Sequence, residues 1–370
     1  MLTEAKAPRI GVDSYLEWLS REGLPLVEGF GVDLFQVQTR PWPRLGIDAA
    51  AVHLKGRGDF VNLFVLDMAP GASTSPQRHL YEEVLYVLSG RGSTVIEAAD
   101  GRKHSFEWGP KSLFAIPLNT RYRHFNGSGS ERALLVSTTS LPAVLNMFHN
   151  EEFVFDNPFR FDDRMGESKY FSGEGDFIPA LPGQHMWETN FVPDLEAIEL
   201  KAWDERGAGS KNIIFILADG TIHAHISEMQ VGTYKKAHRH AADFHVMCVT
   251  GTGYSLLWYE GEPDFHRVDW KHGTVFAPPD RMFHQHFNTS PTPARYLATA
   301  FGSMRHPFTD SKRKSMTGGS SGALKQGGVA TSVKQGGDQI EFEDQSPRIH
   351  ELYRAEAWKT GLVVKMPMFD

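Results

Sequence analysis

The sequence has 370 residues and a mass of 41.5 kDa, with 41% hydrophobic and 22% charged residues. This composition excludes a wholly disordered chain, and the length is enough for about two or three domains with buried cores. A formal net charge of -7 argues against a nucleic-acid binder, and a single cysteine, Cys248, excludes a disulfide framework.

The first segment, residues 1–49, is predicted to form a helical and extended arm. Residues 13–22 place apolar side chains at helical spacing, and Asp13 is a candidate N-cap. The N-terminus carries acidic residues and no apolar run, which argues against a secretory signal peptide. No stretch approaches the roughly 18 apolar residues that a membrane span needs. We therefore expect a cytoplasmic protein without membrane contact.

An internal repeat dominates the middle of the chain. Gly71 and His79 recur 161 positions later as Gly232 and His240, and beyond a one-residue insertion the offset becomes 162. We interpret residues 50–145 and 212–305 as two copies of one module. The pairs that share these offsets are Gln77 with His238, Gly90 with Gly251, Gly92 with Gly253, Trp108 with Trp270, Pro117 with Pro279, His124 with His286 and Asn126 with Asn288.

Each copy reads as a series of short strands. Residues 60–68 and 84–88 in the first copy are rich in β-branched and aromatic side chains, and residues 212–217 and 245–249 in the second copy are similar. Glycine and proline punctuate these runs at intervals of about ten residues. The pattern predicts an all-β fold, a sandwich or barrel in each copy.

Three segments lie outside the copies. Residues 146–211 are predicted to link the two barrels. Residues 306–345 contain a stretch rich in Gly, Ser and Lys that is predicted to be a flexible loop or lid, with a plain linker as the alternative. Residues 346–370 are predicted to form a C-terminal helix and tail, because Ser346 and Pro347 make a good helix start.

The repeated residues follow two spacing patterns, G-x5-H-x-H-x3,4-E-x6-G and G-x5-P-x-G-x2-H-x3-N. With these patterns the chain resembles the cupin family, and the tandem copies resemble a bicupin. The resemblance implies two tandem jelly-roll barrels with short flanking helices. In the second copy the pattern positions are occupied by Gly232, His238, His240, Phe244, Gly251, Gly273, Pro279, Arg281, His284 and Asn288.

The histidines of the second copy are candidate metal ligands. His238 and His240 are two residues apart on a strand and therefore point to one face, and His284 comes from a distant strand. Three neutral imidazoles suit Zn, Cu, Fe or Ni. The alternative is that these histidines are buried and pack against one another. Phe244 stands at the carboxylate position of the pattern, which leaves a three-histidine set with the full charge of the ion, suited to an anionic, bidentate substrate.

This ligand set is similar to that of three-histidine iron dioxygenases, such as the gentisate and salicylate ring-cleaving bicupins. The resemblance implies Fe(II), with Mn, Ni or Zn as alternatives, and a small aromatic, hydroxylated acid that reacts with O2. A second hypothesis keeps the metal as a Lewis acid in decarboxylation, isomerisation or hydrolysis. A third is a non-catalytic small-molecule-binding bicupin. A homo-oligomer is expected in each case.

Other side chains of the second copy have two interpretations each. His286 is a candidate base or alternative ligand, or an ordinary buried histidine. Arg281 is a candidate for binding a substrate carboxylate, or a solvated surface residue. His223 and His225 share a strand face. They are candidates for lining the cavity, or they have a purely structural role. Cys248 is expected to be buried and inert.

The first copy has a degenerate ligand set. Gln77, His79, Glu83 and Tyr122 occupy the ligand positions, and His124 is close enough in sequence to substitute for Tyr122. Gln and Tyr are unusual ligands, so we expect a structural barrel whose polar side chains satisfy one another by hydrogen bonds. The alternatives are a metal held with the help of His124 and a ligand pocket without metal.

Overall fold

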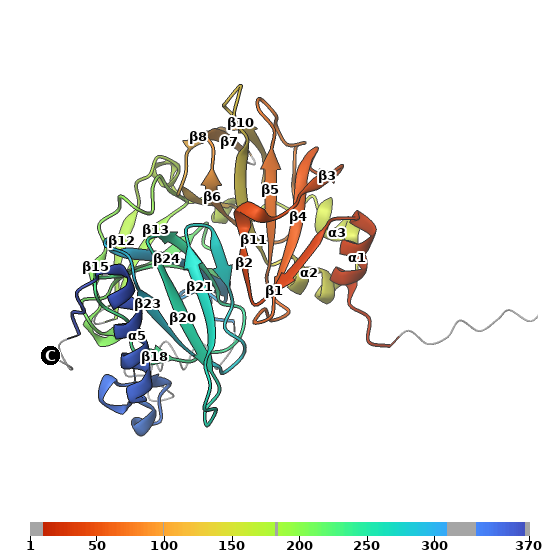
Figure 1. Ribbon diagram of the computed structural model, residues 1–370. Coiled ribbons are helices and arrows are strands. Elements are labelled where there is room, and N and C mark those ends of the chain that lie inside the picture. The colour runs from red at the N-terminus through yellow and green to blue at the C-terminus, as the bar shows by residue number, and fades with distance from the viewer. Residues whose placement is uncertain (1–9, 99, 182–183, 309–330, 367–370) are drawn as a thin grey trace, which may run out of the picture.

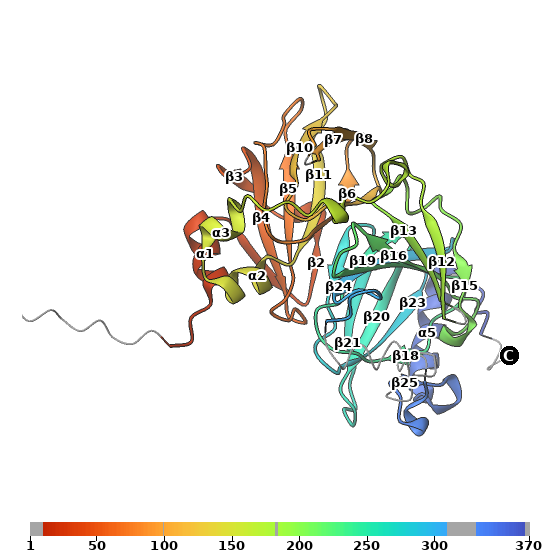
Figure 2. The ribbon, with the colours of Figure 1, turned by 180° about the vertical axis from the view of Figure 1, so that it is seen from behind.

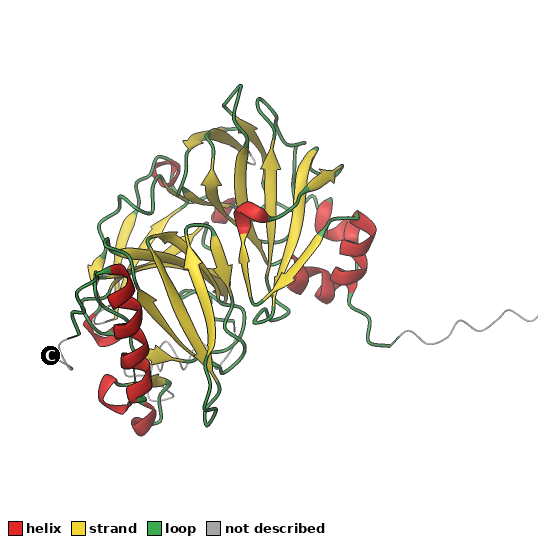
Figure 3. Cartoon of the chain, viewed as in Figure 1, coloured by secondary structure: helices red, strands yellow, loops and turns green. Residues whose placement is uncertain are grey.

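Two β-barrels lie side by side in the computed structural model, which describes residues 10–98, 100–181, 184–308 and 331–366 (Figures 1 and 2). Each barrel consists of a large sheet that faces a small one, and the α-helices lie at the margins (Figure 3). This is the all-β, tandem-barrel fold that the sequence predicts. Because side chains alternate between the two faces of a strand, each barrel buries one face of its sheets in its own interior.

The first barrel encloses a core rich in aromatic side chains, among them Trp42, Phe64 and Phe114. Its large sheet contains, in spatial order, β1 (Leu26–Gly29), β4 (Ile47–Leu54), β5 (Asn62–Met68), β11 (Ala133–Thr139), β6 (Glu83–Ser89), β9 (Leu113–Ile116) and β14 (Phe191–Val192), with β3 (Arg40–Trp42) paired to β4. Its small sheet contains β10 (Arg121–Asn126), β7 (Gly92–Glu97) and β8 (Lys103–Trp108).

The second barrel has the same two-sheet plan. Its large sheet contains β12 (Asp176–Leu181), β13 (Gln184–Thr189), β16 (Lys211–Leu217), β17 (Ile222–Met229), β24 (Ala294–Phe301), β19 (His245–Thr250), β22 (Thr274–Phe276) and β2 (Gly31–Asp33), with β15 (Lys201–Ala202) paired to β16. Its small sheet contains β21 (His266–Lys271), β20 (Thr252–Trp258), β23 (Phe283–Asn288), β18 (Ala237–His238) and β25 (Gln339–Ile340).

Strands from outside the repeated segments complete both barrels. β2, from the N-terminal arm, pairs with β22 of the second barrel, and β14, from the segment between the copies, pairs with β9 of the first barrel. β25, near the C-terminus, pairs with β18. A shared apolar cluster that includes Val65 and Leu297 then packs the two large sheets against each other. The segments predicted as arm and linker therefore contribute strands to the sheets.

The helices begin and end at residues that suit a cap. In α1 (Ser14–Glu22), the Asp13 side chain accepts a hydrogen bond from the Leu16 backbone N–H, as the sequence predicts. α5 (Pro347–Thr360) has Ser346 at its N-cap position and packs on the outer face of the second barrel's small sheet. α2 (Leu141–Phe148) and α3 (Glu151–Phe155) follow the first barrel. The central part of the predicted lid, residues 309–330, lies outside the described residues.

Candidate metal centre

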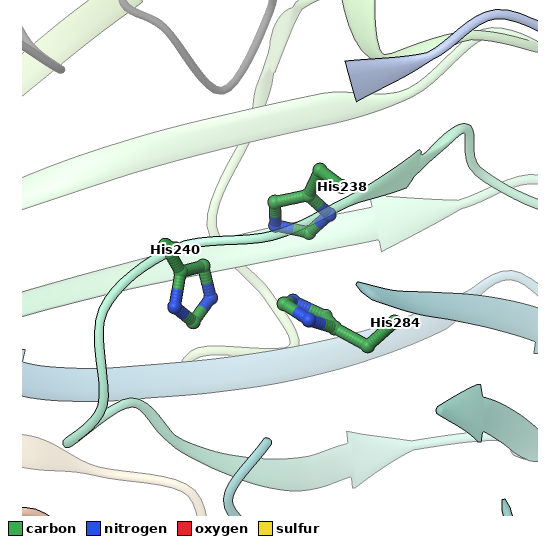
Figure 4. A group of neighbouring side chains, drawn as sticks. All are labelled: His238, His240 and His284. Atoms are coloured by element: carbon green, nitrogen blue, oxygen red, sulfur yellow. The ribbon is translucent and has the colours of Figure 1, made fainter. Parts of the chain in front are cut away.

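Three histidine side chains of the second barrel meet in one place. One ligand nitrogen from each of His238, His240 and His284 lies within 4.8 Å of the other two (Figure 4). The ring centroids of His238 and His284 are 4.1 Å apart, and those of His240 and His284 are 4.6 Å apart. The structure thus brings together the three residues that the sequence predicts as ligands.

Strand pairing explains why these rings meet. β18 and β23 are antiparallel, and His238 stands directly opposite His284 in that pairing. Side chains of directly opposite residues lie on one face, with Cβ atoms about 4.5–5.5 Å apart. His240 follows His238 by two residues and turns to the same side (Figure 4). The register of β18 and β23 therefore places His238 beside His284. β18 ends at His238, so His240 joins them from the segment that follows the strand and not from the predicted strand itself.

Two of the three rings are oriented for a metal ion. The Nδ1–H of His240 donates to the Ala241 carbonyl over 2.8 Å, and the Nδ1–H of His284 donates to the Met282 carbonyl over 3.2 Å. A histidine whose Nδ1–H is held in this way presents the lone pair of Nε2 to an ion. His238 differs, because its Nδ1 faces the guanidinium of Arg206 at 2.6 Å.

The charge state of the rings also suits a cation. Burial, followed by the charge of Arg206, holds the pKa of His238 well below its usual range. Burial, followed by the neighbouring His240 and His286, lowers the pKa of His284 in the same way. These imidazoles are therefore neutral at pH 7, which is the form that binds a metal. The donor set fits a divalent transition metal.

Phe244 occupies the position at which the sequence pattern has a carboxylate. Its ring centroid is 4.0 Å from that of His240, so the cluster has an apolar wall there. Asp243, the adjacent acidic residue, accepts hydrogen bonds from the backbone N–H groups of Gly58 and Phe60. Among the described residues, the group of candidate ligands contains no carboxylate.

Two buried basic side chains lie in the same barrel as the cluster. Arg206 is 3% exposed and Lys235 is 1% exposed, and the Nζ of Lys235 donates to the hydroxyl of Tyr296 over 3.1 Å. Burial lowers the pKa of Arg206 to about 10 and also lowers the pKa of Lys235. Burial raises the pKa of Tyr296, but the charges of Lys235 and Arg206 outweigh this effect and lower it. The interior is positively charged and suited to an anion.

Sequence reasoning did not identify Arg206, Lys235 or Tyr296. Arg206 lies in a segment predicted as a linker, and it reaches the cluster only because that segment folds back beside β18 and β25. Lys235 stands three residues before His238, within the first pattern of the second copy. A lysine inside a pattern whose histidines are expected to face the barrel interior is the one signal of a buried cation that the sequence offers.

His286 belongs to a hydrogen-bonded chain that occurs in both barrels. Its Nδ1 lies 2.8 Å from the Ser255 hydroxyl, which accepts a bond from the indole N–H of Trp270. In the first barrel, His124, Thr94 and Trp108 make the same arrangement. Because these hydrogen bonds occur in both barrels, we infer that they stabilise the barrel structure. In the second barrel they also hold the His286 ring at a centroid distance of 5.5 Å from the His284 ring.

The other candidates of the second copy lie at the edges of the site. The guanidinium of Arg281 is half exposed and forms an ion pair with Asp338 at 2.7 Å. His223 and His225 contact each other at 2.7 Å, and the ring of His225 lies 6.1 Å from that of Tyr296. Cys248 is buried, and burial raises the pKa of its thiol to about 12, so it is inert as expected.

The ligand positions of the first barrel form a closed network. The Tyr122 hydroxyl donates to Glu83 over 2.7 Å, and Nε2 of His79 lies 2.9 Å from the same hydroxyl. Ser137 donates to the other oxygen of Glu83. Burial raises the pKa of Glu83, but the bond from His79 and nearby charge lower it to about 2. Gln77 bonds backbone carbonyls of Arg44 and Ser75 instead. These side chains satisfy one another, as the structural interpretation predicts.

Comparisons with known proteins find one family model and several solved structures. A family model described as Auxin binding protein matches residues 44–159, most of which form the first barrel. The chain has a bicupin fold. Among solved structures it is similar to Lactobacillus farciminis oxalate decarboxylase in complex with formate, with 15% identity, a TM-score of 0.48, and coverage of 75% of this chain and 86% of that one. It is also similar to a Bacillus subtilis oxalate decarboxylase variant, with 14% identity, a TM-score of 0.47, and coverage of 80% and 85%.

The comparison with curated proteins finds no match. No helix among the described residues is long and apolar enough to cross a membrane.

Proposed function

We propose that this bicupin is a metal-dependent enzyme that acts on a small anionic molecule without consuming O2. The observation that carries the proposal is the convergence of His238, His240 and His284 inside a positively charged barrel. A divalent ion bound there would act as a Lewis acid that polarises a substrate oxygen. Decarboxylation, isomerisation and hydrolysis are the reaction classes that this chemistry serves.

The basic side chains account for substrate binding. Arg206 and Lys235 are buried in the same barrel as the cluster, and a buried cation is costly unless an anion or a hydrogen-bond acceptor stabilises it. The hydroxyl of Tyr296 is the acceptor that Lys235 has. A carboxylate group would add a negative charge to this interior and would be attracted to it.

Proton transfer in the proposed reaction is assigned to a histidine and a tyrosine, since no carboxylate is among the candidate metal ligands that the described residues provide. Phe244 removes the base that the sequence pattern would supply. Tyr296 lies beside His286, with ring centroids 4.9 Å apart, and Lys235 stabilises the ionised form of the Tyr296 hydroxyl. Because the Nδ1 of His286 is engaged with Ser255, we assign proton exchange to its Nε2 and to the Tyr296 hydroxyl.

The sequence resemblance predicts an Fe(II) enzyme that uses O2. The three-histidine ligand set by itself does not favour this prediction over another divalent metal and a reaction without O2. Three imidazoles suit Fe, Ni and Zn, and Mn is a further alternative. The buried Lys235 and Tyr296 supply groups for acid–base chemistry, on which the proposed reaction without O2 depends. Arg281 remains a proposed carboxylate contact at the rim, in exchange for its ion pair with Asp338.

A comparison of aerobic and anaerobic turnover tests this function. Protein loaded with Mn, Fe(II), Ni or Zn would be incubated with small mono- and dicarboxylic acids, gentisate and salicylate, and product formation would be followed by mass spectrometry. We expect equal turnover with and without O2, and its loss in Tyr296→Phe. Turnover that stops under anaerobic conditions would contradict the proposed reaction and favour the O2-dependent alternative.

A further inference from the structure

Arg206 lies against one ligand of the candidate metal centre. It ends a 3₁₀ turn (Asp204–Arg206), and its Nη2 donates to Nδ1 of His238 over 2.6 Å. Its Nη1 donates to the side-chain oxygen of Gln339, also over 2.6 Å. Gln339 belongs to β25 and is the pairing partner of His238. The guanidinium is thus fixed between a predicted metal ligand and the strand that covers it.

This contact determines which nitrogen of His238 carries hydrogen. A guanidinium has only donors, so Nδ1 of His238 must accept, and Nε2 of the neutral ring carries the hydrogen. His240 and His284 have the opposite arrangement, because their Nδ1–H groups donate to carbonyls. His238 is therefore the one ring of the three whose tautomer does not suit binding through Nε2.

A metal ion cannot bind His238 while Arg206 holds it. Binding through Nε2 requires the hydrogen to move to Nδ1, which then cannot accept from Arg206. Binding through Nδ1 uses the same lone pair that Arg206 uses. A divalent ion would also repel the buried guanidinium, since like charges interact strongly where water is excluded.

We propose that Arg206 and the metal ion compete for His238, and that metal loading releases the Arg206 guanidinium to bind a carboxylate anion beside the ion. This inference rests on the proposed function. The Nη2 group that leaves His238 belongs to a planar guanidinium whose Nη1 donates to Gln339, and this planar geometry matches a carboxylate. Metal and carboxylate should therefore bind with positive coupling, each tightening the other by the same factor.

The tautomers can be measured without any metal. In metal-free protein at pH 7, ¹⁵N NMR of the histidine side chains should show the Nε2–H form for His238 and the Nδ1–H form for His240 and His284. In Arg206→Met, the Nε2–H preference of His238 should be lost. Finding the Nδ1–H form for His238 in the wild type would overturn the inference, whatever the outcome of metal binding.

The coupling is measured with Co(II), whose visible absorption reports its coordination. Co(II) would be titrated into the full-length protein with and without acetate at constant ionic strength. In the wild type, acetate should tighten Co(II) binding about ten-fold, a typical coupling between two sites. Arg206→Met should bind Co(II) at least ten-fold more tightly than the wild type without acetate, and acetate should then change its affinity less than three-fold.

Two further variants complete the design. Arg206→Gln also removes the charge but keeps a donor, and it provides a second test if Arg206→Met does not fold by circular dichroism. Lys236→Met is the matched control, because Lys236 forms an ion pair with Glu341 beside the same strand and has no bond to His238. Its Co(II) affinity should stay within two-fold of the wild type.

The outcomes separate the two proposals. Co(II) that binds in a histidine-dependent way, with the same affinity in wild type and both Arg206 variants, overturns the competition and leaves the metal centre standing. A wild type that binds no Co(II) overturns the metal centre, and with it the coupling.

Discussion

His79 and His240 occupy the same position of the two repeats and have different surroundings. His79 lies beside Tyr122 and Glu83, which hold its Nε2 within 2.9 Å and 3.3 Å. His240 has the ring of His284 at a centroid distance of 4.6 Å and the apolar ring of Phe244 at 4.0 Å. In the first barrel the polar side chains at the ligand positions form hydrogen bonds with one another. In the second barrel the histidines at these positions converge and can donate nitrogen lone pairs to a metal ion.

Tyr122→Phe tests the closed network of the first barrel. The substitution removes the hydroxyl that bonds both Glu83 and His79 in a buried site. Leaving these buried groups short of a partner should lower the free energy of unfolding by about 1–3 kcal/mol, measured by urea denaturation. Tyr259→Phe, which changes a tyrosine that is 41% exposed, should have almost no effect. Equal effects of the two substitutions would contradict the network.

In the small sheet of each barrel, a tryptophan ring packs directly against a glycine of the neighbouring strand. A Cβ at Gly253 would lie 2.0 Å from the Phe287 carbonyl oxygen and 2.4 Å from the Trp270 ring. Gly92 has the same close approach to Phe125 and Trp108. Gly92 and Gly253 are matching positions of the two repeats. In each barrel, the tryptophan that packs on this glycine is the one whose indole N–H begins the hydrogen-bonded series to His124 or His286. Both barrels therefore require glycine at this position.

Gly253→Ala should therefore destabilise the second barrel. The backbone oxygen and the ring cannot both move away without disturbing β20 and β23, and overpacking of this kind costs about 1–3 kcal/mol or more. Gly129→Ala is the control, because a Cβ there meets nothing within 4 Å. Urea denaturation measures both. A Gly253→Ala protein as stable as Gly129→Ala would show that the close approach does not constrain the sheet.

For the whole molecule, the repeat was sufficient to predict the tandem barrels and the three converging histidines. Both depend on local spacing, since His238 and His240 share a face and His284 lies in the matching position of a second pattern. Arg206 and Gln339 could not be predicted, because they reach the site through segments without a repeat or a pattern. Their positions depend on how β25 pairs with β18, which involves residues about one hundred apart in sequence.

The pH dependence of stability is also a property of the whole molecule. Burial lowers the pKa of His53, His124 and His245 to about 4 in the folded protein. Between about pH 6.5 and 4 the unfolded chain binds more protons at these residues than the folded chain. The free energy of unfolding should therefore fall with falling pH in this window, by about 1.4 kcal/mol per pH unit for each such histidine.

The contribution of His124 can be isolated. Urea denaturation at several pH values between 4 and 7 should show a smaller pH dependence for His124→Gln than for the wild type. His266→Gln, which changes an exposed histidine, should leave the dependence as it is. Glu83, with a pKa lowered to about 2, loses its contribution only below about pH 4.5, outside most of this window. A wild-type stability that is constant from pH 7 to 4 would contradict the buried neutral histidines.

The metal content of the purified protein shows whether the three histidines of the second barrel hold an ion. Inductively coupled plasma mass spectrometry on wild type, His240→Gln and His79→Gln compares the two repeats at one position. We expect about one transition-metal ion per chain in wild type and His79→Gln, and almost none in His240→Gln. A metal content that survives His240→Gln, or that is lost with His79→Gln, would contradict this expectation.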